Sequence, residues 1–139
     1  FPEFRDDKVI DISAERCEIF DNQDTWQCEG SVRVAQGDAI LSAGKMTIFG
    51  TKSENGFSRI EAFGSVRYAS GVNAMSGNAA TYDAANTTLT LTGDVVVVEG
   101  EQIMTGGRLV YNTTTGATVF TPPPSGRVRG VFFPGKNGL

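Results

Sequence analysis

The residue types that most often carry out catalysis are sparse in this chain of 139 residues. The chain has no histidine, which removes the commonest general base and metal ligand. No serine lies in a Gly-x-Ser-x-Gly elbow, Gly106–Gly107 is not part of a phosphate-binding loop, and the acids lack metal-loop spacing. We therefore expect no enzyme, no cofactor and no metal site. Folding could still bring two carboxylates together, so a polysaccharide-cleaving enzyme stays as the least favoured alternative.

The two cysteines have a spacing that predicts a covalent bond. If the chain folds back at Asn22–Gln23, Cys17 lies directly opposite Cys28. Opposed residues of an antiparallel pair come within disulfide range at non-hydrogen-bonded positions. A bridge across so short a loop would stabilise the fold by about 2–3 kcal/mol, and it would indicate an oxidising compartment. Two buried free thiols are the alternative.

The elements that position these residues follow from a phrase that recurs four times. Each copy has a small or hydroxyl-bearing cluster near its start and an aromatic residue at its end, and a second phrase, Gly-Ser-Val or Gly-Asp-Val, precedes the last three copies. A period of about thirty residues is typical of stacked repeats whose units cannot bury their apolar face alone. The copies are Ile12–Phe20, Leu41–Phe49, Ala74–Tyr82 and Ile103–Tyr111.

Short alternating stretches and regular turn signals predict an all-β fold. Apolar residues alternate with small or polar ones, and Gly-, Asn- and Asp-rich turns divide the chain into about eight arms. No stretch shows the caps and period of a helix. With 40% apolar residues and 17 glycines, we expect a single domain over residues 1–139, with its core at about 8–133 and flexible ends.

Small residues fall at the middle of the arms. Glycine inside a strand usually marks a bend or a bulge. If every arm bends there, eight arms give about sixteen short antiparallel strands in two facing sheets, open at the seam and at both ends. A flat meander with glycines placed by chance is the alternative. Folding the chain at its turns places Gly30 opposite Ala43, Gly64 opposite Gly77, and Gly93 opposite Gly107.

Charge and apolar edges suggest how the ends of such a stack behave. The net charge of −4 argues against nucleic acid. Residues 1–29 hold nine acids and three bases, whereas residues 123–139 hold three bases and no acid. Opposite ends could attract in a head-to-tail contact, or both could simply be solvated. The last arm is apolar and bounded by prolines, which predicts an exposed edge for strand addition. This assembly edge comprises Arg127, Val128, Arg129, Val131, Phe132 and Phe133.

No apolar run is long enough to cross a bilayer, and the first residues lack the pattern of a signal peptide. We therefore expect a mature soluble protein or an excised piece.

The repeats in order resemble a known family. Gly30–Gly37 followed by Leu41–Met46, and Leu89–Val97 followed by Met104–Tyr111, are similar to the LptA/OstA-like periplasmic lipopolysaccharide-transport proteins of Gram-negative bacteria. The likeness covers roughly residues 8–133. The sequence departs from the family at Gly44 and Gly106, where the family more often shows an acid, and in its cysteine pair.

The resemblance implies a bent OstA-like β-jellyroll that shelters the acyl chains of lipid A in an apolar groove. It also implies end-to-end assembly in the periplasm into a bridge from the inner to the outer membrane. The implied partners are lipopolysaccharide, an inner-membrane-anchored component, an outer-membrane component and further copies of the chain. An excised domain of either membrane-bound partner is one alternative. A carbohydrate-binding or structural β-repeat protein is an alternative of another class.

If the resemblance holds, alternating aliphatic residues line the groove, because each methylene removed from water contributes roughly 0.8 kcal/mol. A one-residue error in register would turn these residues outward. An ordinary dry sandwich core is the alternative for each of them. The proposed lining is Val32, Val34, Ile40, Val66, Tyr68, Val95, Val97 and Ile103.

Overall fold

The structure is a computed structural model that describes residues 9–52 and 56–134. The predicted flexible ends fall largely outside these residues. Within them the chain forms one antiparallel sheet of ten strands and one short 3₁₀ helix, η1 (Asp21–Gln23). The strands are β1 (Asp11–Ser13), β2 (Arg16–Phe20), β3 (Thr25–Gln36), β4 (Ala39–Phe49), β5 (Arg59–Ser70), β6 (Asn73–Asp83), β7 (Thr88–Glu99), β8 (Gln102–Asn112), β9 (Thr118–Thr121) and β10 (Arg129–Val131).

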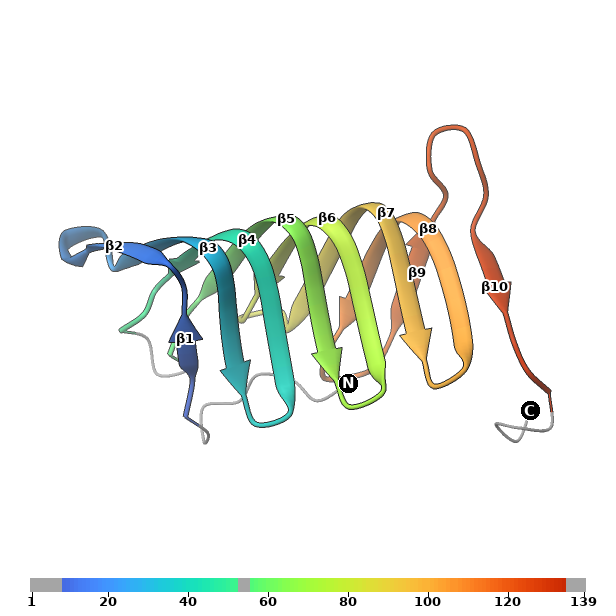
Figure 1. The fold of residues 1–139 in the computed structure, drawn as a ribbon, viewed down its shortest axis with the longest axis horizontal. Coiled ribbons are helices and arrows are strands. Elements are labelled where there is room, and N and C mark those ends of the chain that lie inside the picture. The colour runs from blue at the N-terminus through green and yellow to red at the C-terminus, as the bar shows by residue number, and fades with distance from the viewer. Residues whose placement is uncertain (1–8, 53–55, 135–139) are drawn as a thin grey trace.

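The six long strands, β3 to β8, all bend at their middle, so that the sheet folds over into two legs below a common crest (Figure 1). The front leg holds the tight turns of the β3–β4, β5–β6 and β7–β8 hairpins, and β1 and β10 flank it. The back leg holds the opposite ends of the long strands, and β2 and β9 flank it. We call the open side opposite the crest the seam.

Three pairs of residues bend β3, β5 and β7 at the crest. In each pair a glycine and the residue after it both have a positive φ: 81° and 47° at Gly30–Ser31, 84° and 49° at Gly64–Ser65, and 80° and 47° at Gly93–Asp94. The strand register shifts at each pair. Two consecutive left-handed residues form a bulge that turns the strand without ending it. The recurring Gly-Ser-Val and Gly-Asp-Val phrases therefore encode the bends.

The predicted bend at mid-arm is present, but the predicted count of about sixteen short strands in two sheets is wrong. Six arms stay hydrogen-bonded on both sides of the crest, so each is one long strand that serves both legs. Only the four short strands, β1, β2, β9 and β10, belong to a single leg. The sheet is not closed into a barrel.

The predicted pairing of small residues is also displaced. Each front-leg hairpin has a two-residue turn that starts with glycine, with φ of 59° at Gly37, 59° at Gly71 and 60° at Gly100. Glycine in the first turn position is the pattern of a type II′ turn. The observed turns set a register that differs from the predicted one, so in each hairpin a valine, in place of the predicted glycine, lies opposite a small residue. Ala43 lies opposite Val32, Gly77 opposite Val66, and Gly106 opposite Val95.

Two neighbouring glycines allow a matched test of the crest. An ideal Cβ would meet no atom closer than 3.8 Å at Gly64 or 3.6 Å at Gly44, and only Gly64 has a positive φ, of 84°. We expect Gly64→Ala to lower the free energy of unfolding by about 1–2 kcal/mol, because alanine is strained in left-handed backbone. Gly44→Ala should change it by less than about 0.5 kcal/mol or raise it. Urea denaturation measures both, and equal losses would contradict the role of the left-handed pairs.

Candidate functional site

The candidate site is the interior between the two legs. On the front leg, strand register aligns one apolar row across the stack, and burial shows that this row faces inward. Val34, Leu41 and Tyr68 in this row are at most 1% exposed. The row consists of Ile12, Val34, Leu41, Tyr68, Met75, Val97 and Met104.

The back leg supplies a second inward-facing row that the sequence interpretation missed. Ile48, Ile60 and Leu89 in this row are at most 1% exposed. The sequence did contain a signal for this row. Apolar and polar residues alternate on both sides of the central glycine of each long strand, and the half in the back leg supplies the row. The row consists of Trp26, Ile48, Ile60, Tyr82, Leu89 and Tyr111.

Six of the eight residues proposed to line the groove face the interior. They are at most 7% exposed: Val32, Val34, Val66, Tyr68, Val95 and Val97.

Ile40 and Ile103 do not line the interior. Ile40 pairs with Ala35 and Ala69, and Ile103 pairs with Val98 and Val131, which places both on the outer face of the front leg. Each isoleucine is followed by another apolar residue, Leu41 or Met104, and that neighbour takes the inward position. Alternation alone could not decide which of two adjacent apolar residues faces inward.

The interior is packed with side chains along most of the stack and opens at its N-terminal end. A cavity of about 250 Å³ lies there between β1 and β3 of the front leg and β3 and β4 of the back leg. Its lining is mostly apolar and includes Ile10, Ile12, Trp26, Val34, Ile48 and Phe57, with Thr51 as a polar member.

The two rims of the seam are built differently. On the back rim, neighbouring loops are joined by main-chain hydrogen bonds: Gly50 N–H to Asp24 O at 2.8 Å, Ala84 N–H to Ser58 O at 2.9 Å, and Thr113 N–H to Thr87 O at 2.8 Å. The front rim consists of three separate two-residue turns, with open space around Gly71 and Gly100. Among the described residues, main-chain hydrogen bonds join front leg to front leg or back leg to back leg, and none crosses the seam.

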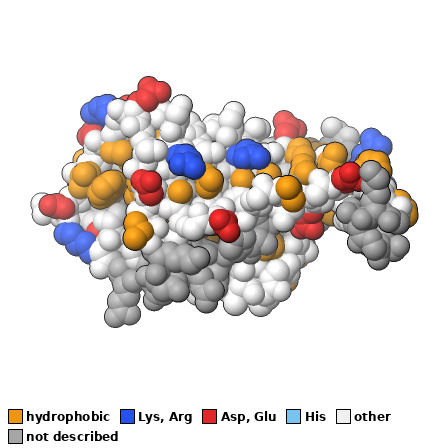
Figure 2. All heavy atoms as spheres, turned by 60° about the horizontal axis from the view of Figure 1, so that its bottom comes forward, with side chains coloured by type: hydrophobic (Ala, Val, Ile, Leu, Met, Phe, Trp, Pro, Cys, Tyr) orange, Lys and Arg blue, Asp and Glu red, His pale blue; other side chains and the backbone are white. Residues whose placement is uncertain are grey.

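Apolar side chains also reach the surface at both ends of the stack. With the seam side turned forward, apolar side chains appear at the left and right of the molecule and in a broken row between them, with charged side chains scattered around them (Figure 2). Val9 and Ile19 are 86% and 55% exposed at the N-terminal end, and Phe132 and Phe133 are 49% and 44% exposed at the C-terminal end.

The assembly edge is shorter as a strand than the sequence predicted. β10 covers only Arg129–Val131, and Phe132 and Phe133 follow it outside the strand. Arg127 and Val128 precede it in the chain that returns from β9.

Cys17 and Cys28 are paired across β2 and β3 and are joined by a disulfide with an S–S distance of 2.03 Å. Cys28 is 1% exposed and faces the interior, whereas Cys17 lies exposed on the edge strand. The bond therefore fastens β2, which has no buried residue, to the body of the sheet.

Two side chains have a shifted pKa, Asp24 on the back rim and Tyr111 in the interior. The Thr51 hydroxyl donates to Asp24 Oδ1 at 2.6 Å and the Lys52 N–H donates to it at 3.0 Å. Mainly because of the Thr51 hydrogen bond, the pKa of Asp24 is lowered from its ordinary value of 3.8. Burial, with a smaller contribution from the charge of Glu99, raises the pKa of the Tyr111 phenol, which reflects a desolvated interior.

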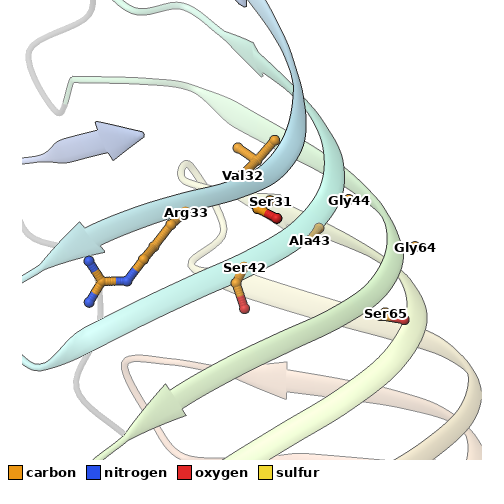
Figure 3. A pocket seen from close by; sticks show the side chains of 8 residues that line it. All are labelled: Ser31, Val32, Arg33, Ser42, Ala43, Gly44, Gly64 and Ser65. Atoms are coloured by element: carbon orange, nitrogen blue, oxygen red, sulfur yellow. The ribbon is translucent and has the colours of Figure 1, made fainter. Parts of the chain in front are cut away.

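The outer side of the crest carries shallow hollows at the bulges. One, of about 600 Å³, is lined by Ser31, Ser42 and Ser65 with Arg33, while Val32 points to the opposite side (Figure 3). The next repeat carries a similar hollow of about 340 Å³ around Arg67. Both are open depressions that follow from the bulge geometry.

Residues 9–52 and 56–134 contain no group of three or more His, Cys, Asp or Glu side chains placed to hold a metal ion. In the same part of the chain, no helix has the length and apolar character needed to cross a membrane.

The family described as LptA/(LptD N-terminal domain) LPS transport protein matches residues 11–117. The chain belongs to this family. The matched segment runs from β1 to the turn before β9, and so contains the whole crest and both inward-facing rows.

Two further comparisons agree with family membership. An uncharacterised protein of Rhizobium meliloti is 31% identical over 118 residues, which cover 79% of this chain and 63% of that protein. The chain thus spans less than two thirds of that relative. The crystal structure of LptH from Pseudomonas aeruginosa, described as the LptA-homologous periplasmic component of the lipopolysaccharide transport device, superposes with a TM-score of 0.81. The two sequences are 20% identical, and the superposition covers 96% of this chain and 100% of the LptH chain, which shows a shared fold.

The Asp24 contacts predict a pH-dependent contribution to stability. Because the pKa of Asp24 is lowered in the folded state, the contribution is present above pH 3.8 and is lost as the pH falls through the folded-state value. We expect Asp24→Asn to reduce the urea midpoint at pH 7 and to have a smaller effect at pH 2.5–3. The same reduction at both pH values would show that the carboxylate charge does not matter.

Proposed function

We propose that this chain is a periplasmic lipopolysaccharide-binding transport protein that holds the acyl chains of lipid A between its legs. Family membership supports lipopolysaccharide transport, and the fold shared with LptH supports a comparable architecture. The disulfide between Cys17 and Cys28 is consistent with an oxidising compartment such as the periplasm.

One observation carries the proposal: apolar rows line both legs along the whole stack, and no main-chain hydrogen bond between described residues closes the seam. Among the described residues, separating the legs at the seam therefore disrupts side-chain contacts and no main-chain hydrogen bond. An acyl chain that enters replaces those contacts, and each of its methylenes gains roughly 0.8 kcal/mol on leaving water. The packed interior is then the empty, closed state of the groove.

The way the legs are joined indicates how the groove opens. Each long strand is continuous through the crest, and no main-chain hydrogen bond between described residues joins the two rims. We infer that the legs separate at the seam by hinging about the crest. Because the inward rows are similar from repeat to repeat, neighbouring positions have similar free energies and a lipid can shift along without a deep trap. Direction must come from outside the chain.

The strand order supports end-to-end assembly. The front leg contains β1, the six long strands and β10, and the back leg contains β2, the six long strands and β9. Each leg therefore has an even number of antiparallel strands. The two ends of each leg therefore run in opposite directions, and a second copy placed head to tail continues the antiparallel alternation on both legs. We propose that such chains, with an inner-membrane-anchored and an outer-membrane partner of the same fold, form a bridge between the membranes.

Charge at the two ends supports the same contact. Described residues 9–29 hold six acids and one base, and residues 118–134 hold two arginines and no acid. Complementary ends favour encounter in the head-to-tail orientation.

Photo-crosslinking tests the groove with matched neighbours. A crosslinking residue at Val34, Tyr68 or Val97 faces the interior, and one at Arg33, Arg67 or Val96 lies on the same strand but on the outer face. We expect adducts with intact lipopolysaccharide at the three inner positions and little at the outer ones. Deacylated lipopolysaccharide should give none.

Absence of adducts at all three inner positions, with each variant folded by circular dichroism, would contradict lipid binding between the legs. Equal labelling by the deacylated form would instead favour a carbohydrate-binding protein.

Light scattering tests the assembly. We expect the average mass to rise with protein concentration and to fall as salt is added, because salt screens the complementary ends. Changing both Arg127 and Arg129 to Glu should abolish the rise, whereas Arg67→Glu, on the outer face in mid-stack, should leave it unchanged. A strictly monomeric wild-type chain at every concentration would rule out head-to-tail assembly, whether the chain is a free component or a domain of a membrane-bound partner.

A further inference from the structure

The C-terminal end of the stack presents one aromatic ring on the inward side. A Cβ added to Gly130 would lie 3.2 Å from the Phe132 ring and 3.6 Å from Met104. Gly130 pairs with Met104, the last member of the inward front-leg row, so the absence of a side chain at Gly130 leaves room for the ring there. Phe132 is nevertheless 49% exposed, because β10 is the last of the described strands at this end of the sheet.

The N-terminal end presents an apolar cavity at the same level of the front leg. Ile12 and Val34, which line the cavity, are the first members of the row that ends at Met104 and Gly130. Trp26, Ile48 and Phe57 complete the lining from the back-leg side. One row therefore has a half-exposed ring at one end and a hollow at the other.

The sizes of ring and hollow agree. A cavity of about 150 Å³ lined by aliphatic and aromatic side chains is large enough to bind benzene. The N-terminal cavity is about 250 Å³, so it can accept one phenyl ring. A head-to-tail neighbour would place β10 beside β1, and antiparallel pairing there would continue the row from Gly130 of one copy to Ile12 of the next.

We propose that the Phe132 ring of one copy enters the N-terminal cavity of the next copy and anchors the end-to-end contact. This inference rests on the head-to-tail assembly proposed above and names the residues that hold it. The excess of acids around β1 and β2 and the arginines at 127 and 129 orient the ends, and the buried ring provides the affinity. Phe133 is the natural control, because it is the adjacent residue of the same type and is exposed to a similar extent, 44%.

Analytical ultracentrifugation of four chains tests the proposal: the wild type, Phe132→Ala, Phe133→Ala, and Ile12→Trp, which fills the cavity. We expect Phe132→Ala and Ile12→Trp each to weaken self-association about tenfold or more, as loss of a central aromatic anchor does. Phe133→Ala should associate like the wild type. Circular dichroism and lipid cross-linking at Tyr68 report whether each variant is folded and able to bind lipid.

Mixing the two weakened variants gives the sharper readout. The Ile12→Trp chain keeps its ring and the Phe132→Ala chain keeps its cavity, so one good contact remains, and a one-to-one pair should form without longer chains. The proposal would be overturned if Phe132→Ala associates like the wild type, or if Phe133→Ala loses as much self-association as Phe132→Ala. It would also be overturned if the mixture of folded variants forms no pair. If Ile12→Trp does not fold, the comparison of Phe132→Ala with Phe133→Ala decides. A wild type that never associates would remove the head-to-tail assembly itself, while lipid cross-linking at Tyr68 tests the groove separately.

Discussion

The left-handed backbone at three Gly-Ser or Gly-Asp pairs is the constraint on which the rest of the structure depends. Positive φ at two consecutive residues turns β3, β5 and β7 through the crest, and β4, β6 and β8, which are paired with them, follow the same bend. One sheet thereby acquires two apolar inner faces that cover each other. Without the bend, those faces would lie on one side of a flat meander and would remain in water.

The same bend underlies the lipid entrance proposed at the seam. Main-chain bonding holds the legs together at the crest, and no main-chain hydrogen bond between described residues joins them at the seam. Hydrogen bonds join the loops of the back rim into a row, and strand pairing joins the front hairpins to one another. The proposed groove opens on one side to admit lipid and closes again when empty. Its apolar lining therefore stays out of water both in the lipid-bound state and in the empty state.

The sequence predicted the all-β class, the repeats and the bend, because glycine at mid-strand and the turn signals are local features with local causes. The strand count could not be predicted, since whether a strand ends or continues at a bulge depends on hydrogen bonds across to its neighbours. Ile40 and Ile103 were assigned to the wrong face because each adjoins another apolar residue and the register follows from the exact turn length. The back-leg row was missed because the face that it presents depends on the strand register beyond each bulge, which alternation in the sequence alone does not specify. The Phe132 ring and the N-terminal cavity involve residues far apart in sequence, which only the fold relates to each other.

The central claim is that acyl chains part the legs at the seam. Spin labels on two exposed turn residues, Val72 of the front rim and Ala85 of the back rim, measure this directly by pulsed electron resonance. The account predicts that the label-to-label distance increases when lipopolysaccharide is added and does not change with its deacylated form. An unchanged distance at saturating lipopolysaccharide would contradict it.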